Sequence, residues 1–129
     1  MKKLPRFDDG WQPVVGALGH GRFFVSTGEI LMPEFKVGGK ESGETLKLSG
    51  STKVEATAQV EWTFPPAFAE IIWGDGHEVK RQRVDLSDQE AFSSKVLHIP
   101  VELRGAKWVR LEVWDIAVNG AFSQPVWIE

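Results

Sequence analysis

The stretch that decides the fold is the C-terminal one: Trp108-Val-Arg-Leu-Glu-Val-Trp-Asp115, then Asn119-Gly120, then Ala121-Phe-Ser-Gln-Pro-Val-Trp-Ile-Glu129. Asn-Gly between two apolar-patterned runs is the strongest short-range signal of a β-hairpin, because both residues tolerate the positive φ of a type I′ turn. We therefore predict a C-terminal hairpin that turns at Asn119-Gly120.

The strand before this turn has two different faces, because successive side chains of a strand point to opposite sides of the sheet. Val109, Leu111 and Val113 form one face, which we expect to lie in the core. The other face carries two tryptophans, an arginine and a glutamate: Trp108, Arg110, Glu112 and Trp114. Such a face is rarely left open to water, so we expect something to cover it.

Strand signals recur at short spacing through the rest of the chain. The clearest strand runs from Thr52 to Thr63, where apolar and polar residues alternate. We predict that its inward-facing residues are Val54, Ala56, Ala58, Val60 and Trp62. Further strands are predicted at 22–26, 30–37 with Pro33 at a bulge or an edge, 45–48, 69–73 and 79–86 as a hairpin, and 94–103.

One short helix is predicted near the N-terminus, in the stretch that follows Asp9 and Gly10. Either of these two residues would lie near the N-cap, and Gly19 or Gly21 would end the helix. Its apolar face is predicted to consist of Val14, Val15 and Leu18. We expect residues 1–20 to be an N-terminal extension that carries this helix, and residues 21–129 to be one β-domain.

The predicted fold class is all-β: an immunoglobulin-like β-sandwich of about eight or nine strands with one short N-terminal helix. A closed barrel is the main alternative. A chain of 129 residues suits a single domain and is long enough to bury a core without disulfides. Disulfides are in any case excluded, because the chain has no cysteine.

Charge and composition exclude several classes of function. The formal net charge of −3 gives no basic footprint for nucleic acid, and no apolar run approaches the length of a membrane span. The apolar stretch of a signal peptide is missing after Lys2-Lys3, so we expect a cytoplasmic protein. We expect no cofactor.

The sequence contains no recognisable catalytic motif. The three histidines, His20, His77 and His98, have no metal-binding spacing, and the serines lie in no nucleophile elbow. We therefore predict no catalytic residue and no metal ligand. Glu112 and Arg110 are two apart on one strand face, where they either form an ion pair or place a carboxylate in a ligand or catalytic site.

Two segments resemble a known family. The stretch from His20 to Leu31, HGRFFVSTGEIL, resembles the segment that ends the catalytic domain in PHP-type metal-dependent hydrolases of the CehA-like group. The stretch from Trp108 to Trp127 resembles the closing strand pair of the same proteins. The chain departs from the pattern at Glu29, where proline is usual, and at Gln124, where asparagine is usual.

The resemblance implies an accessory domain. In that family the preceding domain holds the metals and performs the hydrolysis, so no catalytic residue carries over to this chain. Trp108, Arg110, Glu112 and Trp114 would then be docking residues for the catalytic domain. His20 and Arg22 would lie where the two domains meet, either near the rim of the active site or in local roles, with His20 at the helix end and Arg22 paired to a carboxylate.

Two functions follow as expectations. The first is a non-catalytic accessory β-sandwich that acts by packing on a catalytic domain or by forming a homodimer. The alternative is a ligand-binding module, for example for carbohydrate, whose exposed tryptophans stack on sugar rings. The two differ in geometry, because a sugar platform needs coplanar and solvent-exposed tryptophan side chains, whereas docking or core residues would be buried or ridged.

Overall fold

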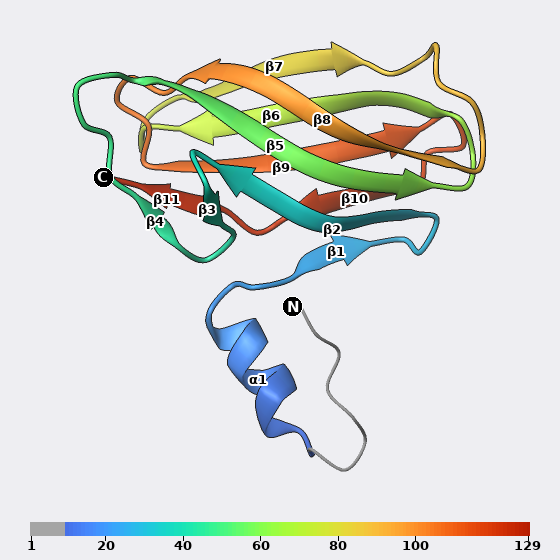
Figure 1. Ribbon diagram of the computed structural model, residues 1–129, viewed down its shortest axis with the longest axis horizontal. Coiled ribbons are helices and arrows are strands. Elements are labelled where there is room, and N and C mark those ends of the chain that lie inside the picture. The colour runs from blue at the N-terminus through green and yellow to red at the C-terminus, as the bar shows by residue number, and fades with distance from the viewer. Residues whose placement is uncertain (1–9) are drawn as a thin grey trace.

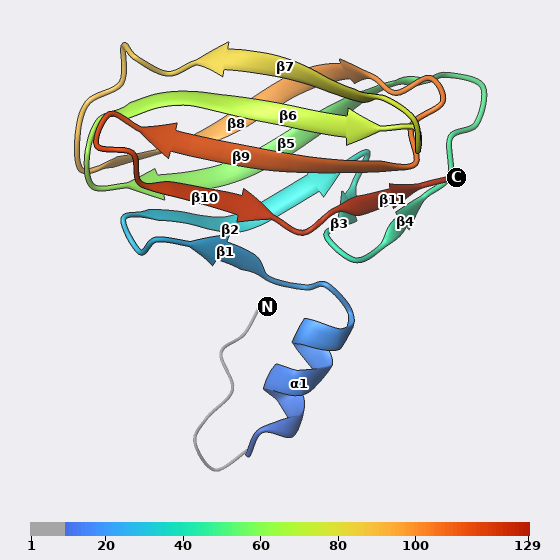
Figure 2. The same ribbon diagram turned by 180° about the vertical axis from the view of Figure 1, so that it is seen from behind.

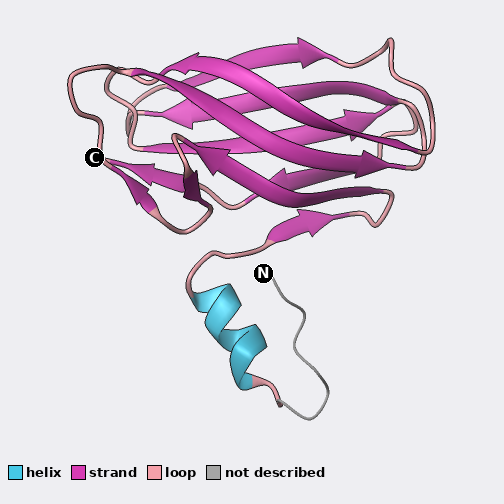
Figure 3. Cartoon of the chain, viewed as in Figure 1, coloured by secondary structure: helices cyan, strands magenta, loops and turns pink. Residues whose placement is uncertain are grey.

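The computed structural model describes residues 10–129, which form two stacked β-sheets and one short helix (Figures 1 and 3). The all-β sandwich predicted from the sequence is therefore confirmed. Of the predicted N-terminal extension, residues 1–9 lie outside the described residues.

The first sheet, here called sheet B, has four strands in the order β3-β2-β5-β8. Their bounds are β2 Ile30–Val37, β3 Lys40–Glu41, β5 Lys53–Trp62 and β8 Ser93–Glu102. All its pairings are antiparallel, and the longest joins β5 to β8 from Lys53↔Glu102 to Trp62↔Ser93. The register of β2 against β5 shifts between Leu31 and Glu34, which confirms the bulge predicted at Pro33.

The second sheet, sheet A, has seven strands and faces the viewer in Figure 2. Their bounds are β1 Phe24–Ser26, β4 Thr45–Leu46, β6 Pro66–Gly74, β7 Val79–Asp85, β9 Trp108–Asp115, β10 Gly120–Ser123 and β11 Val126–Ile128. β9 is central: β6 pairs with one side of it, while β10 and β11 share the other side, one after the other along its length. β7 extends the sheet beyond β6, and β1 extends it beyond β10.

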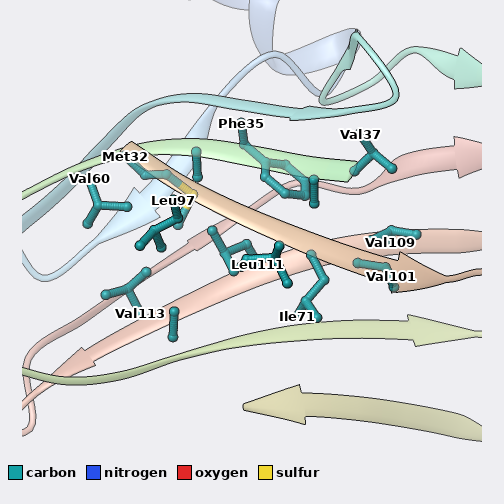
Figure 4. Close-up of a cluster of buried hydrophobic side chains, with 14 of the residues drawn as sticks. Met32, Phe35, Val37, Val60, Ile71, Leu97, Val101, Val109, Leu111 and Val113 are labelled. Atoms are coloured by element: carbon teal, nitrogen blue, oxygen red, sulfur yellow. The ribbon is translucent and has the colours of Figure 1, made fainter. Parts of the chain in front are cut away.

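The core lies between the two sheets and consists of their inward-facing side chains (Figure 4). β5 contributes Val60 and β9 contributes Leu111, each fully buried. The inward faces predicted for β5 and β9 are thus confirmed, with Val54 only partly buried at the strand end. The alternation succeeds as a predictor because each strand has one face on the core and one toward solvent.

The C-terminal hairpin is present, but its predicted turn is wrong. The chain reverses over Asp115–Asn119: the Asp115 amide donates to the Asn119 carbonyl oxygen at 3.0 Å, and Val118 has the positive φ of +65°. Gly120 is already the first residue of β10, opposite Trp114. The Asp115 carboxylate explains the longer turn, because its Oδ1 accepts hydrogen bonds from the amides of Ala117 and Asn119 at 2.8 and 2.9 Å.

The predicted helix exists as α1, Gln12–Gly19, and it extends away from the sandwich (Figure 1). Its N-cap residue is Trp11, directly after Gly10, so Gly10 lies near the N-cap as expected, while Asp9 lies outside the described residues. The expected apolar face does not pack on the core: Val15 and Leu18 are more than half exposed and Val14 is half-buried.

Candidate functional site

The outer face of sheet A carries the tryptophan face predicted from β9. Trp108, Arg110, Glu112 and Trp114 all lie on this face, and all four are half-buried. The register places each of them beside an outward-facing residue of β6: Gly74, Ile72, Glu70 and Phe68, in that order. The face is therefore a mixed aromatic and charged surface that side chains of its own strands cover in part.

Each tryptophan of β9 lies against a glycine of a neighbouring strand. A Cβ added to Gly74 would meet the Trp108 ring at 2.6 Å, and a Cβ added to Gly120 would meet the Trp114 ring at 2.6 Å. Cross-strand aromatic rings commonly cover glycine in this way and shield the exposed backbone. The half-burial of both tryptophans thus comes from the sheet itself.

The centre of the face is a cluster of two carboxylates and three arginines. Glu70 and Glu112 are directly opposite one another, and only about 10% of the Glu70 side chain is exposed. Arg110 Nη1 donates to Glu112 Oε1 at 2.8 Å, which is the direct ion pair that the sequence spacing favoured. Arg81 and Arg83 approach Glu70 at 3.8 and 3.7 Å.

The second oxygen of Glu112 is also engaged. The Trp114 indole N–H donates to Glu112 Oε2 at 3.4 Å, so both carboxylate oxygens have a partner on β9. A carboxylate held from both oxygens is positioned and neutralised by its neighbours. This arrangement favours a structural role for Glu112 over proton transfer.

Three further exposed apolar side chains of the face lie on the other side of β9 from β6. We call Val25, Phe122 and Trp127 the β10–β11 strip; they are 41%, 37% and 49% exposed. Val25 is opposite Phe122, and Trp127 is opposite Trp108, so the strip continues the tryptophan face toward β1 and β11.

A shallow hollow of about 320 Å³ opens between Phe122 and β11. It forms where β10 ends and β11 begins, and it is lined by Arg110, Glu112, Phe122, Ser123, Gln124 and Pro125. Ser123 Oγ on β10 accepts a hydrogen bond from the Leu111 amide of β9 at 3.0 Å. Two of the predicted site residues, Arg110 and Glu112, therefore line this hollow.

The other two predicted residues, His20 and Arg22, lie at the junction between α1 and β1, and both are exposed. His20 Nδ1 lies 2.7 Å from the Gly16 carbonyl oxygen, which places this side chain at the helix end. The junction backbone packs against Gly43, where an added Cβ would collide with the His20 carbonyl oxygen. Gly43 in turn donates its amide to the Pro125 carbonyl at 2.9 Å, so the junction lies next to one wall of the hollow.

The remaining histidines lie elsewhere. His98 projects from β8 and its Nδ1 is 2.9 Å from Glu55 Oε1, while His77 follows Asp75 in the turn between β6 and β7. Within residues 10–129, no group of three or more histidine, aspartate and glutamate side chains is arranged to hold a metal ion. The helix described here is too short to cross a membrane.

Sequence reasoning missed Glu70, Phe122 and Trp127. These residues come from three different strands, and only the pairing of β6, β10 and β11 with β9 brings them to one face. The sequence signal that could have found them was Trp127, an outward-facing aromatic residue in the last strand. Which residues lie beside it on the sheet could not be known without the strand register.

The comparisons with known proteins give no match to a family model, a curated protein or a solved structure. The account of its function therefore depends on the geometry of the site.

Proposed function

We propose that this chain is a non-catalytic accessory β-sandwich whose β10–β11 strip packs on another protein surface. In the setting that the resemblance to PHP-type hydrolases implies, that surface belongs to a neighbouring catalytic domain. In the isolated chain, a second copy covers the strip.

The observation that carries this proposal is the exposure of the strip. Its three side chains are apolar, lie on the same sheet face and keep 37% to 49% of their surface in water, with Val25 opposite Phe122 and Trp127 further along β9, opposite Trp108. Burial of apolar surface contributes about 25 cal/mol per Å², so a contact on this strip is favourable wherever a complementary surface is available. Arg110 and Glu112 beside it are already paired, which lowers the cost of removing them from water.

NMR spectra recorded over a dilution series test the proposal. We expect the Trp127 indole and the Phe122 amide to shift with concentration in NMR spectra, because the strip is covered when two copies meet. Val96 on β8, which is 53% exposed on the other sheet, is the matched control and should not shift. Equal shifts at Val96 and Trp127, or none at either, contradict the proposal.

A carbohydrate-binding module is the second candidate, and the hollow is the observation that favours it. Its lining combines the Phe122 ring with the polar groups of Arg110, Glu112 and Gln124, the mixture that a neutral sugar requires. Trp108 and Trp114, however, lie half-buried over glycines, which disfavours a flat platform of exposed rings. Quenching of tryptophan fluorescence by a neutral oligosaccharide, lost in Phe122→Ala, would favour this candidate over docking.

A further inference from the structure

The free edges of the two sheets differ in how they are protected. An edge strand exposes a row of unpaired backbone N–H and C=O groups to which another strand can pair, and proteins usually block such edges. Among residues 10–129, the edge strands β1, β3 and β4 are only two or three residues long. The longer edges are β7 in sheet A and, in sheet B, β8 and the part of β2 that β3 does not pair, residues 30–35, which carries Pro33.

The β8 edge is interrupted by proline. The Leu103 amide donates to the Thr52 carbonyl oxygen at 2.8 Å. In an antiparallel ladder every second residue bonds to the neighbouring strand, so the odd-numbered residues of β8 are those that bond to β5. By this alternation the backbone groups of Pro100 point away from β5, toward the free edge. Proline has no N–H to offer there, and its carbonyl oxygen already accepts Gln82 Nε2 at 3.2 Å.

The β7 edge has no such block. The Leu86 amide donates to Ala67 at 3.0 Å and the Asp75 amide donates to Glu78 at 3.2 Å, so the even-numbered residues of β7 bond to β6. The backbone N–H and C=O groups at the free edge are then those of the odd-numbered residues: Val79, Arg81, Arg83 and Asp85. The strand contains no proline, and its seven residues offer a continuous edge.

Two of the side chains along this edge are basic. Arg81 and Arg83 lie on the outer face of sheet A, with side chains 54% and 61% exposed. Their contacts with Glu70, at 3.8 and 3.7 Å, are longer than the roughly 2.8 Å of a charge-assisted hydrogen bond, so donors on both guanidinium groups are free for another acceptor. Arg83 is held in place by its guanidinium over the Phe68 ring, 3.8 Å from the ring centroid.

We propose that β7 receives an extended acidic segment of a partner protein as an added strand of sheet A. The edge supplies main-chain hydrogen bonds, and the two arginines select aspartate or glutamate at alternate positions, because residues opposite Arg81 and Arg83 fall on the same face. A second copy of β7 does not fit, since pairing would bring arginines of both copies together. This site is the edge of the sheet, so it is independent of the β10–β11 strip.

A synthetic peptide about as long as β7 tests this proposal, with capped ends and alternating threonine and glutamate. In the free chain, hydrogen exchange should be fast at the amides of Arg81 and Arg83 and slow at those of Gln82 and Val84. Binding of the peptide should slow exchange at Arg81 and Arg83. A control peptide of the same composition, with its glutamates in one block, should bind more weakly.

Two substitutions of Arg81 separate the contribution of its side-chain charge to peptide binding from the contribution of its backbone N–H. Arg81→Gln keeps the outward N–H and should weaken binding about threefold, the size expected of one exposed charge pair. Arg81→Pro also removes that N–H, which no strand within residues 10–129 uses, and should weaken binding roughly tenfold further. An unchanged melting temperature in both variants confirms that the fold is retained.

Three results would overturn the proposal. The first is fast exchange at Arg81 and Arg83 that saturating peptide leaves unchanged. The second is equal affinity for the alternating and the blocked peptide, which would indicate charge attraction without strand pairing. The third is equal binding by Arg81→Pro and Arg81→Gln.

Discussion

At the scale of single residues, the two tryptophans of β9 each fit closely against a glycine of a neighbouring strand. Trp108 and Trp114 lie on an outer face yet stay half-buried, because each covers a glycine on the next strand. Neither glycine has a positive φ, so the backbone itself would accept an alanine. A residue larger than glycine is disfavoured at Gly74 and Gly120 because its side chain would collide with the tryptophan ring that covers it.

We predict that Gly120→Ala lowers the free energy of unfolding by about 1–3 kcal/mol, the usual cost of overpacking. The new methyl group would lie 2.6 Å from the Trp114 ring and must displace it. Chemical denaturation measures the loss. In a Trp114→Ala background the same change should cost little, because the obstacle is gone.

The matched control is Gly16→Ala in α1, where an added Cβ meets nothing within 4 Å. It should leave the protein as stable or more stable, since alanine is favoured over glycine in helices by about 1 kcal/mol. Equal losses for Gly120→Ala and Gly16→Ala would contradict the role assigned to the tryptophan ring.

A second prediction at residue scale concerns how the stability of the fold depends on pH. The hydrogen bonds that the amides of Glu78 and His77 donate to Asp75 lower the pKa of this carboxyl below its usual 3.8. A lowered folded-state pKa stabilises the fold above the unfolded value, and the stabilisation is lost as pH falls through the folded pKa. Asp75→Asn should therefore reduce the dependence of the melting temperature on pH below about 4, where aspartate titrates.

Asp88→Asn serves as its control, because the Asp88 carboxylate accepts a bond from the exposed side chain of Gln89 and lies in a loop. If the two variants respond to acid alike, the turn bonds of Asp75 do not contribute to the stability of the fold.

At the scale of elements, alternation of apolar and polar residues predicts strands well and turns less well. β5 is found within one residue of its predicted bounds, because its inward residues meet the opposite sheet along its whole length. The Asn119-Gly120 turn was wrong because the Asp115 carboxylate binds the amides of the loop and extends the turn. The strand count was also too low, because β3 is only two residues long and the second strand of the predicted C-terminal hairpin is divided into β10 and β11.

A pair of substitutions in β5 tests the two faces of this element. Val60 is fully buried, so Val60→Asp places an unpaired charge in the core and should abolish the cooperative unfolding transition, since its cost of several kcal/mol approaches the whole stability of a domain. Gln59→Asp lies on the other face and should change stability by about 0.5 kcal/mol or less. Circular dichroism during thermal melting separates the two outcomes.

The site residues could be predicted from the sequence only where they lie on a single strand. One strand, β9, was enough to place Trp108, Arg110, Glu112 and Trp114 on a single face. Glu70 and Trp127 needed knowledge of which strands adjoin β9, and that depends on long-range packing rather than on local pattern. His20 and Arg22 were grouped with this face through the family resemblance, and the structure places them at the helix junction beside it.

At the scale of the whole molecule, the two outer faces of the sandwich have different characters. Sheet B carries the exposed pair His98 and Glu55 on its outside, whereas sheet A carries the arginine–glutamate cluster and, beside it, the apolar strip. The apolar residues of α1 add to the exposed apolar surface at the β1 end of the molecule (Figure 2). Sheet B also exposes Leu31 and Val96, so the arginine–glutamate cluster, rather than apolar exposure, distinguishes the outer face of sheet A.

The central claim is that the β10–β11 strip is an interface, and the mass of the chain in solution tests it most directly. In a light-scattering dilution series we predict a dimer that dissociates on dilution, and a monomer at all concentrations for Trp127→Ala, with little loss in melting temperature because half of this side chain is already in water. A monomer throughout, or a dimer that survives both Trp127→Ala and Phe122→Ser, would contradict the account.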